Sequence, residues 1–204
     1  MKILLVDDHR MMRDGLRALI ARAPGLSVVG EAGDGREAVT LAERQQPDVI
    51  VMDVSMPGLN GIDATRQMLL RQPCARVIAL SMHADPRYVA AMRDAGARGY
   101  VLKDAAYHEL VRAIREVAAG GTFFEQWDPD PELPSSRAAL TPREREILQL
   151  LAEGKSSKAM ADTLKIAVST VETHRKQIMA KLGLRSTAEL TKFAVREGLT
   201  SLGD

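Results

Sequence analysis

The sequence predicts an α/β domain with a doubly wound parallel sheet, followed by a smaller domain made only of helices. Three observations support this fold class. The 204 residues suffice for one large or two small domains. Residues 1–120 alternate short apolar runs with helix-like patterns five times, as in an open sheet built from β–α repeats. Residues 140–204 contain helical patterns and no strand pattern.

The strands of the first domain are expected at five apolar runs. Several runs are apolar on both faces, as a parallel strand covered by helices on both sides requires. The expected strands are residues 3–6, 28–29, 49–52, 77–80 and 100–102. Between them, apolar residues recur at the spacing of one helix face, as at Leu16 and Ile20. Sheets of this kind bind ligands beyond the carboxyl ends of their strands.

Four helices are expected in residues 140–204. In a capping box, a Ser or Thr and a Glu three residues later each bond the other's backbone, which starts a helix. The chain contains three such pairs: Thr141 with Glu144, Ser169 with Glu172, and Ser186 with Glu189. Gly154 and Gly183 stand where helices are expected to end. A further short helix is expected over residues 157–164.

Residues 121–139 are expected to be an acidic, proline-containing linker. They carry one basic and four acidic side chains, and three prolines interrupt any periodic pattern. The flanking segments, residues 1–120 and 140–204, carry net charges of +1 and +3. The domain boundary is therefore expected in this segment.

The composition excludes several classes of protein. Aromatic residues make up only 3%, which argues against a stacking platform for bases or sugars. The single cysteine, Cys74, excludes a disulfide framework and a cysteine-based zinc site. The longest apolar runs are too short to cross a bilayer, and Met1 leads directly into a strand-like run. We therefore expect a soluble, cytoplasmic protein that does not enter a membrane.

Polar side chains stand at the carboxyl ends of four expected strands. Asp7 and Asp8 follow the first, Asp53 follows the third, Ser81 the fourth and Lys103 the fifth. Because these strand ends share one edge of the sheet, the side chains are expected to converge. Three carboxylates repel one another unless a cation lies among them, and oxygen ligands favour Mg²⁺. With an added ammonium and hydroxyl, they predict a phosphoryl-transfer site with one aspartate as the nucleophile.

Residues 1–120 resemble the receiver domain of two-component response regulators. The segments that carry the resemblance are LLVDDH (4–9), DVSMPGLNG (53–61), LSMH (80–83) and GYVLKD (99–104). The resemblance implies that Asp53 is the phosphoacceptor and that a sensor histidine kinase is the donor. It also implies that Asp7 and Asp8 hold Mg²⁺ with Asp53 and the backbone carbonyl of Ser55. Lys103 would pair with the aspartate or its phosphoryl group.

The resemblance also assigns a switch and two tuning positions. Ser81 and Tyr100 would form the switch pair, the hydroxyl moving to a phosphoryl oxygen and the ring turning inward. Ser55 and His83, each two residues beyond a site residue, would tune the lifetime of the phosphoryl group. His83 would either orient water or only pack. Lys103 is followed by Asp104 where most receivers have proline, a feature similar to the NarL/FixJ branch.

Residues 140–204 resemble the LuxR-type helix-turn-helix DNA-binding domain. The resemblance is carried by LTPREREILQLLAEGKSSK (140–158), STVETHRKQIMAKLGLRS (169–186) and AEL (188–190). The residues expected to contact double-stranded DNA are Lys158, Ser169, Thr170, Glu172, Thr173, His174, Lys176 and Lys181. Thr173 and Lys176 are the expected base contacts, because a methyl group fits thymine and an ammonium fits guanine.

Other expected contacts position the domain without reading bases. Lys158, Thr170, His174 and Lys181 are expected to meet phosphates. Glu172 either accepts from cytosine or serves only as a cap, and its position in a capping box favours the cap. In the last helix, Leu190, Phe193 and Ala194 form either core or a dimer seam.

Together, the two halves predict a transcription factor gated by phosphorylation. Phosphorylation of Asp53 would bias a two-state receiver surface, which then either releases the DNA-reading helix or forms a homodimer. The dimer would engage paired half-sites and the transcription machinery. The chain is not expected to be an enzyme beyond phosphorylation and dephosphorylation of its own Asp53.

Three other functions share some of these features. A Mg²⁺ phosphatase would share the aspartate nucleophile, but Ser55 stands where its general acid is expected and no cap domain is present. A DNA-binding regulator could use the receiver only as a dimerisation or ligand module. A small-molecule quorum sensor would need an aromatic-lined pocket, which the first half of the sequence does not offer.

Overall fold

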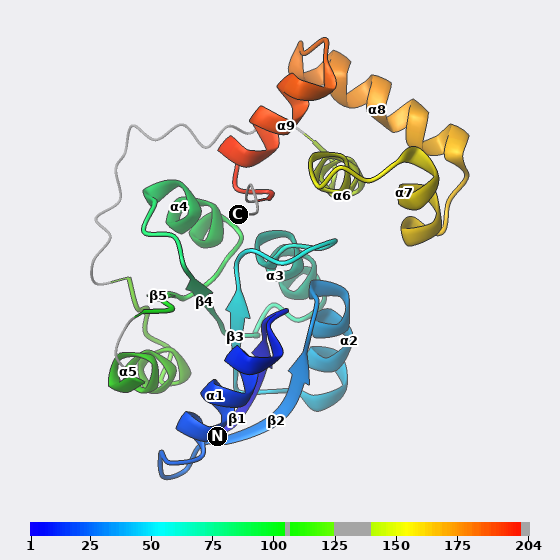
Figure 1. Ribbon diagram of the computed structural model, residues 1–204. Coiled ribbons are helices and arrows are strands. Elements are labelled where there is room, and N and C mark those ends of the chain that lie inside the picture. Colours follow the sequence, from blue (N-terminus) through cyan, green and yellow to red (C-terminus); the bar gives the residue numbers. More distant parts are fainter. Residues whose placement is uncertain (105–106, 125–139, 201–204) are drawn as a thin grey trace. The chain divides into compact units, whose positions relative to one another are not determined.

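The computed structural model describes residues 1–104, 107–124 and 140–200. These residues form two compact units, one on each side of residues 125–139 (Figure 1). No helix in the described ranges is long and apolar enough to cross a membrane.

The first unit is built on a five-stranded parallel sheet with the order β2-β1-β3-β4-β5 (Figure 1). The strands are β1 (Lys2–Val6), β2 (Ser27–Ala32), β3 (Val49–Asp53), β4 (Val77–Ser81) and β5 (Gly99–Leu102). All five expected strands are confirmed, and each is longer than its apolar run. From β1 the chain adds β2 on one side of the sheet and then β3, β4 and β5 on the other side. The connections from β1 and from β3 therefore diverge and leave a crevice at the carboxyl ends of these two strands, which is where such sheets bind ligands.

Helices cover both faces of this sheet. They are α1 (Arg10–Ile20), α2 (Gly35–Gln45), α3 (Gly61–Arg71), α4 (Pro86–Asp94) and α5 (Tyr107–Ala118). Ile3 and Leu5 of β1 belong to the core that α1 and α5 cover, whereas Leu4 and Val6 belong to the core beneath α2, α3 and α4. The continuous apolar run of β1 follows from this arrangement, because successive side chains enter opposite buried layers.

The first unit extends beyond residue 120, where the linker was expected to begin. Phe123 is 1% exposed and packs in the core with α1 and α5. Its backbone pairs beside β5, where the Phe123 amide donates to Arg98 O and Phe123 O accepts from the Tyr100 amide, both at 2.8 Å. The start of the expected linker is therefore corrected to a position after Phe124. The acidic part of the linker, in residues 125–139, lies outside the described residues.

The second unit contains the four expected helices. They are α6 (Pro142–Ala152), α7 (Ser157–Leu164), α8 (Val168–Leu182) and α9 (Thr187–Arg196). The capping boxes at Thr141 and Ser186 are confirmed. The expected box at Ser169 is wrong, because α8 begins at Val168 with Ala167 as its N-cap, two residues before the expected N-cap. Ser169 therefore lies inside the first turn of the helix, where its side chain cannot cap it.

The core of the second unit also decides the role of two α9 residues. Leu190 and Ala194 are fully buried in it, together with residues such as Ile147 and Ile178. Of the two interpretations left open for these residues, core or dimer seam, their burial supports core, because side chains buried within one chain are not available to a second one. Phe193 is only partly buried.

Candidate functional site

The carboxyl edge of the sheet brings Asp7, Asp53 and Lys103 into direct contact. Lys103 Nζ lies 2.7 Å from Asp7 Oδ2 and 2.7 Å from Asp53 Oδ2. Asp7 and Asp53 are 1% and 2% exposed. Two carboxylates buried this deeply need a compensating charge, and the ammonium supplies part of it. Three of the residues predicted from separate strand ends thus form one cluster.

The segment after β3 explains why Asp53 is held so tightly. Asp53 Oδ1 accepts a hydrogen bond of 3.1 Å from the Ser55 amide. A Cβ atom on Gly61 would lie 2.0 Å from Asp53 O, so only glycine lets the start of α3 pass this close. Asn60 caps α3 by accepting from the Asp63 amide at 2.8 Å. The PGLNG sequence therefore serves to seat α3 against the end of β3.

Burial and the neighbouring charges shift the pKa values of Asp53 and Lys103. Burial raises the pKa of Asp53 to about 6, although the Lys103 charge and its hydrogen bond act in the opposite direction. Burial would lower the pKa of Lys103, but the charges and hydrogen bonds of Asp53 and Asp7 outweigh it and raise that pKa. Lys103 is therefore a permanent cation, while the ionised form of Asp53 is destabilised by its surroundings.

The donor set fits a divalent cation. One ligand atom each from Asp7, Asp8, His9 and Asp53 lie within 4.8 Å of one another. Asp8 is partly exposed, so that side of the cluster is open to solvent. Carboxylate oxygens with access to water are the ligands that Mg²⁺ prefers. Together, these residues fit the magnesium site that the sequence predicts.

The expected switch residues meet in the loop after β4. The His83 amide donates to Ser81 Oγ at 3.0 Å, and the Tyr100 hydroxyl donates to His83 O at 2.8 Å. Tyr100 is buried, which raises its pKa and keeps the hydroxyl protonated as a donor. The His83 ring stacks on Tyr88 of α4, with ring centroids 4.8 Å apart. The loop therefore joins Ser81, Tyr100 and α4 in one set of contacts.

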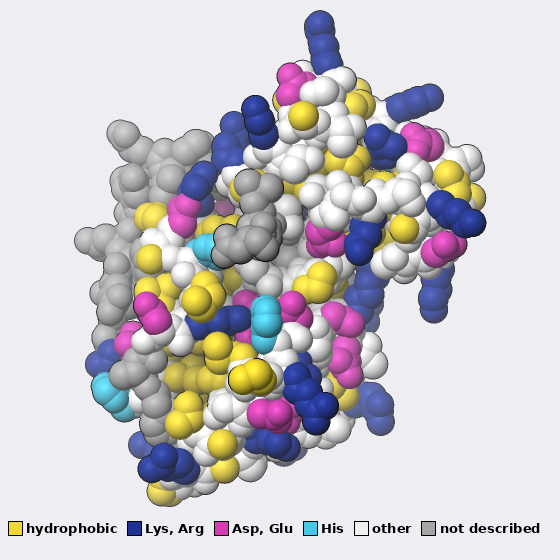
Figure 2. Space-filling view, viewed as in Figure 1, with side chains coloured by type: hydrophobic (Ala, Val, Ile, Leu, Met, Phe, Trp, Pro, Cys, Tyr) yellow, Lys and Arg dark blue, Asp and Glu magenta, His cyan; other side chains and the backbone are white. Residues whose placement is uncertain are grey.

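In the second unit, most of the expected DNA-contacting side chains are exposed on α7 and α8, and basic side chains stand out from this unit's surface (Figure 2). The exposed residues are Lys158, Ser169, Thr170, Thr173, Lys176 and Lys181. His174 is partly buried. Lys181 forms an ion pair of 2.7 Å with Glu144 of α6, so it also holds two helices together.

Glu172 has partners other than the expected cap. Its Oε1 accepts from the Ser157 hydroxyl of α7, and it also accepts from Arg175 Nη1 at 3.1 Å. Arg175 Nη1 lies 3.1 Å from the Ser157 oxygen as well. The interpretation of Glu172 as a capping residue is therefore wrong, and its side chain instead connects α7 to α8.

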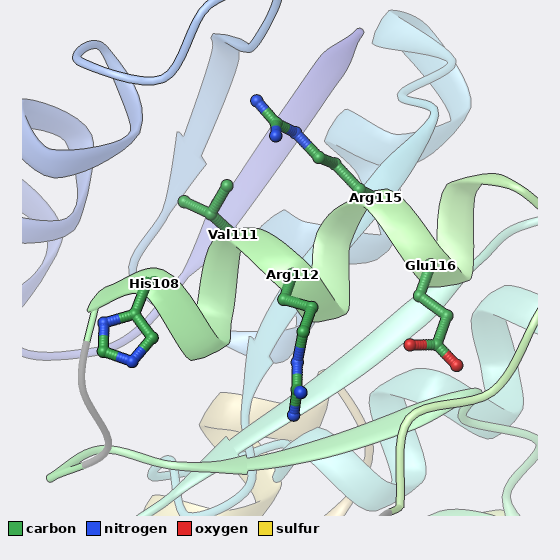
Figure 3. A pocket seen from close by; sticks show the side chains of 5 residues that line it. All are labelled: His108, Val111, Arg112, Arg115 and Glu116. Atoms are coloured by element: carbon green, nitrogen blue, oxygen red, sulfur yellow. The ribbon is translucent and has the colours of Figure 1, made fainter.

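The sequence did not indicate Ser157, Tyr88 or the Glu144–Lys181 pair. These contacts join residues that lie on different elements, up to 37 positions apart, and no local motif marks them. A further hollow lies on α5, lined by His108, Val111, Arg112, Arg115 and Glu116 (Figure 3). These five side chains come from one helix and point in different directions, so they do not converge on a ligand position.

Two family models match the chain. The model of the response regulator receiver domain matches residues 3–115, and the model of the bacterial regulatory proteins of the luxR family matches residues 138–194. The chain is 40% identical over 204 residues to the transcriptional regulatory protein MctR of Rhizobium johnstonii, covering 98% of this chain and 95% of that protein.

Two further similarities extend over nearly the whole chain. The nitrate/nitrite response regulator protein NarL of Escherichia coli is 36% identical over 206 residues, covering 96% of this chain and 95% of that protein. The structure of RcsB from Salmonella enterica serovar Typhimurium, bound to promoter rprA in the presence of the phosphomimetic BeF3-, is 26% identical. It has a TM-score of 0.62 and covers 99% of this chain and 100% of that one.

Proposed function

Because the chain belongs to the two-component response regulators with a LuxR-type DNA-binding domain, we propose that Asp53 is the phosphoryl acceptor that controls its binding to DNA. The protein is a transcription factor of this family rather than an enzyme. Its receiver domain implies a histidine kinase as partner. The observation that carries the proposal is the Lys103 ammonium, held 2.7 Å from both buried aspartates.

In the proposed step, an Asp53 carboxylate oxygen attacks the phosphorus of a phosphohistidine. A new O–P bond forms, the N–P bond breaks, and the departing imidazole nitrogen takes up a proton. Mg²⁺ bound by Asp7, Asp8, Asp53 and the Ser55 carbonyl would supply positive charge against the phosphoryl oxygens. Lys103 stays beside the acyl phosphate and balances the added negative charge.

The loop after β4 then transmits the change. The Ser81 hydroxyl gives up the hydrogen bond that it accepts from the His83 amide and donates one to a phosphoryl oxygen, and the loop after β4 moves with it. Tyr100 is tied to this loop through His83 O, so its ring position depends on the loop position. His83 and Ser55 are the proposed residues that set the lifetime of the phosphoryl group.

The second unit reads DNA through α8. Thr173 and Lys176 are the proposed base contacts, since both are exposed on this helix. Lys158, Ser169, Thr170, His174 and Lys181 are the proposed contacts that position the helix on the backbone. The relative RcsB is bound to promoter DNA in its solved structure, which supports this use of the domain. We further propose a phosphorylated homodimer on paired half-sites, which recruits the transcription machinery in the cytoplasm.

An intact-mass measurement tests the acceptor. The protein is incubated with acetyl phosphate and Mg²⁺, beside Asp53→Ala and Asp63→Ala variants that circular dichroism shows to be folded. One phosphoryl adduct is expected in the wild type and in Asp63→Ala, and none in Asp53→Ala. If the folded wild type takes no adduct, the receiver acts without phosphate and the proposal fails.

A further inference from the structure

The metal-binding edge of the sheet contains an imidazole as well as carboxylates. His9 Nδ1 lies 2.9 Å from Asp8 Oδ1 and 3.4 Å from Asp7 Oδ1. The His9 amide donates to Asp7 Oδ1 at 2.8 Å, which fixes the position of His9 directly before α1. Its side chain is 72% exposed, so the ring can turn toward an ion without displacing core residues.

Lys103 does not pair with the carboxylate oxygens that lie nearest to His9. The ammonium pairs with the Oδ2 atoms of Asp7 and Asp53, whereas the imidazole lies beside the Oδ1 atoms of Asp7 and Asp8. An ion held among these carboxylates therefore has a nitrogen donor nearby, because one ligand atom each from Asp7, Asp8, His9 and Asp53 lie within 4.8 Å of one another. Lys103 keeps its ion pairs.

We propose that His9 is a nitrogen ligand of this site and that it shifts the site's preference from Mg²⁺ toward first-row transition-metal ions such as Mn²⁺. Imidazole suits transition metals, whereas Mg²⁺ prefers oxygen ligands and keeps several of its waters. The inference rests on the metal site of the proposed function. It adds that the ion which loads the receiver depends on the supply of transition metal, because one extra ligand discriminates between the two ions.

A second explanation of the same geometry is a surface histidine that only lies beside the Asp8 carboxylate as a charge partner. The two explanations predict different binding constants. A histidine that is only a charge partner affects both ions alike, since it acts through the carboxylate. A nitrogen ligand strengthens Mn²⁺ binding and leaves Mg²⁺ binding almost unchanged.

Direct binding measurements on the full chain separate these explanations. Titration calorimetry gives the Kd of Mn²⁺ and of Mg²⁺ for the wild type, His9→Ala and His108→Ala. His108 is an exposed histidine of α5 outside the cluster, so its replacement controls for loss of an imidazole. We expect His9→Ala to lower the preference for Mn²⁺ over Mg²⁺ by roughly tenfold, within the range that metal-site partners contribute. His108→Ala should keep the wild-type ratio.

Pulsed electron paramagnetic resonance of bound Mn²⁺ supplies a second readout. Coupling to ¹⁴N is expected in the wild type and in His108→Ala, and it should disappear in His9→Ala. An unchanged ratio of Kd values, or a nitrogen signal that survives in His9→Ala, overturns the inference.

An Asp8→Asn variant tells the failure of this inference from the failure of the proposed site. If Asp8→Asn weakens the binding of both ions while His9→Ala changes nothing, the magnesium site stands and only the role of His9 is wrong. If Asp8→Asn leaves both ions bound as in the wild type, the ions bind elsewhere. Both proposals for this metal site then fail.

Discussion

Asp53 is positioned by a fold that disfavours its ionised form. The carboxyl group is buried, and its pKa in the folded protein is raised from 3.8 to about 6. The folded protein therefore retains this proton to a higher pH than the unfolded chain does. Asp53 contributes stability that is complete below about pH 4 and is lost as the pH rises through about 6. Near neutral pH, the ionised residue accordingly favours whatever brings positive charge to it.

This shift predicts how Asp53→Asn changes stability. The amide cannot ionise. In metal-free buffer at pH 7, the free energy of unfolding of the variant should therefore be about 3 kcal/mol higher than that of the wild type. The advantage should shrink as the pH is lowered toward 4. Urea unfolding followed at several pH values measures it. Asp94→Asn, at an exposed carboxylate, serves as the control and should change stability by less than about 0.5 kcal/mol. A gain of the same size at every pH would contradict this account.

At the scale of the element, sequence signals succeeded where both partners lie within one turn. The capping boxes at Thr141 and Ser186 join residues three positions apart, and both form. The pair Ser169 and Glu172 has the same spacing but does not form a box, because Val168 is already helical. Glu172 bonds instead to Ser157, 15 positions away on α7. The contact between α7 and α8 therefore outweighs the local capping spacing at Glu172. Such a contact between distant residues cannot be predicted from a local sequence pattern.

The same substitution, glycine to alanine, should have opposite effects on the free energy of unfolding at two positions. Gly15 lies inside α1, where an added methyl group would have no neighbour within 4 Å, so Gly15→Ala should raise the free energy of unfolding by about 0.5–1 kcal/mol. Gly61→Ala should lower it by about 2–3 kcal/mol, because the methyl group would meet Asp53 O at 2.0 Å. Chemical denaturation of both variants checks this. Equal effects would mean that α3 moves freely relative to β3.

The contacts of Glu172 predict a positioning role in α8. Glu172→Ala should lower the stability of the helical domain by about 1 kcal/mol, since a partly exposed network linking α7 and α8 is lost. The preference of the Glu172→Ala variant at each base pair of its DNA site should stay that of the wild type. Lys176→Ala, by contrast, should relax the preference at one position. Binding to a set of single-base variants of the site measures both. A loss of preference for one cytosine in Glu172→Ala would instead make Glu172 a base reader.

At the scale of the whole molecule, the sequence predicted two domains because β–α repeats and helix-only patterns occupy separate stretches. The cores confirm this division, since each contains residues of one unit only. The strand-end residues were also predictable, because parallel strands bring their carboxyl ends to one edge. The place of Phe123 was not predictable in the same way. Phe123 is one of three aromatic residues in residues 121–139, and this proline-rich, acidic segment shows no period that would assign it to the sheet edge.

Phosphorylation of the receiver can act on DNA binding by two mechanisms. The two mechanisms predict that the gain in DNA affinity depends differently on the number of half-sites. If the receiver releases α8, phosphorylation raises the affinity for one half-site and for two. If it creates a dimer, a single half-site gains nothing, whereas paired half-sites gain because the second binding event becomes intramolecular. We expect the second pattern, with a gain of roughly 10–100-fold on paired half-sites at fixed salt concentration.

Fluorescence anisotropy on duplexes with one or two half-sites measures both constants, using protein treated with acetyl phosphate. Asp53→Ala treated in the same way is the matched control and should bind both duplexes as untreated protein does. Equal gains on both duplexes would establish release of the DNA-reading helix instead of pairing. In that case the exposed face of α9 would not need to meet a second copy, and the partly buried Phe193 would be explained by packing within its own domain.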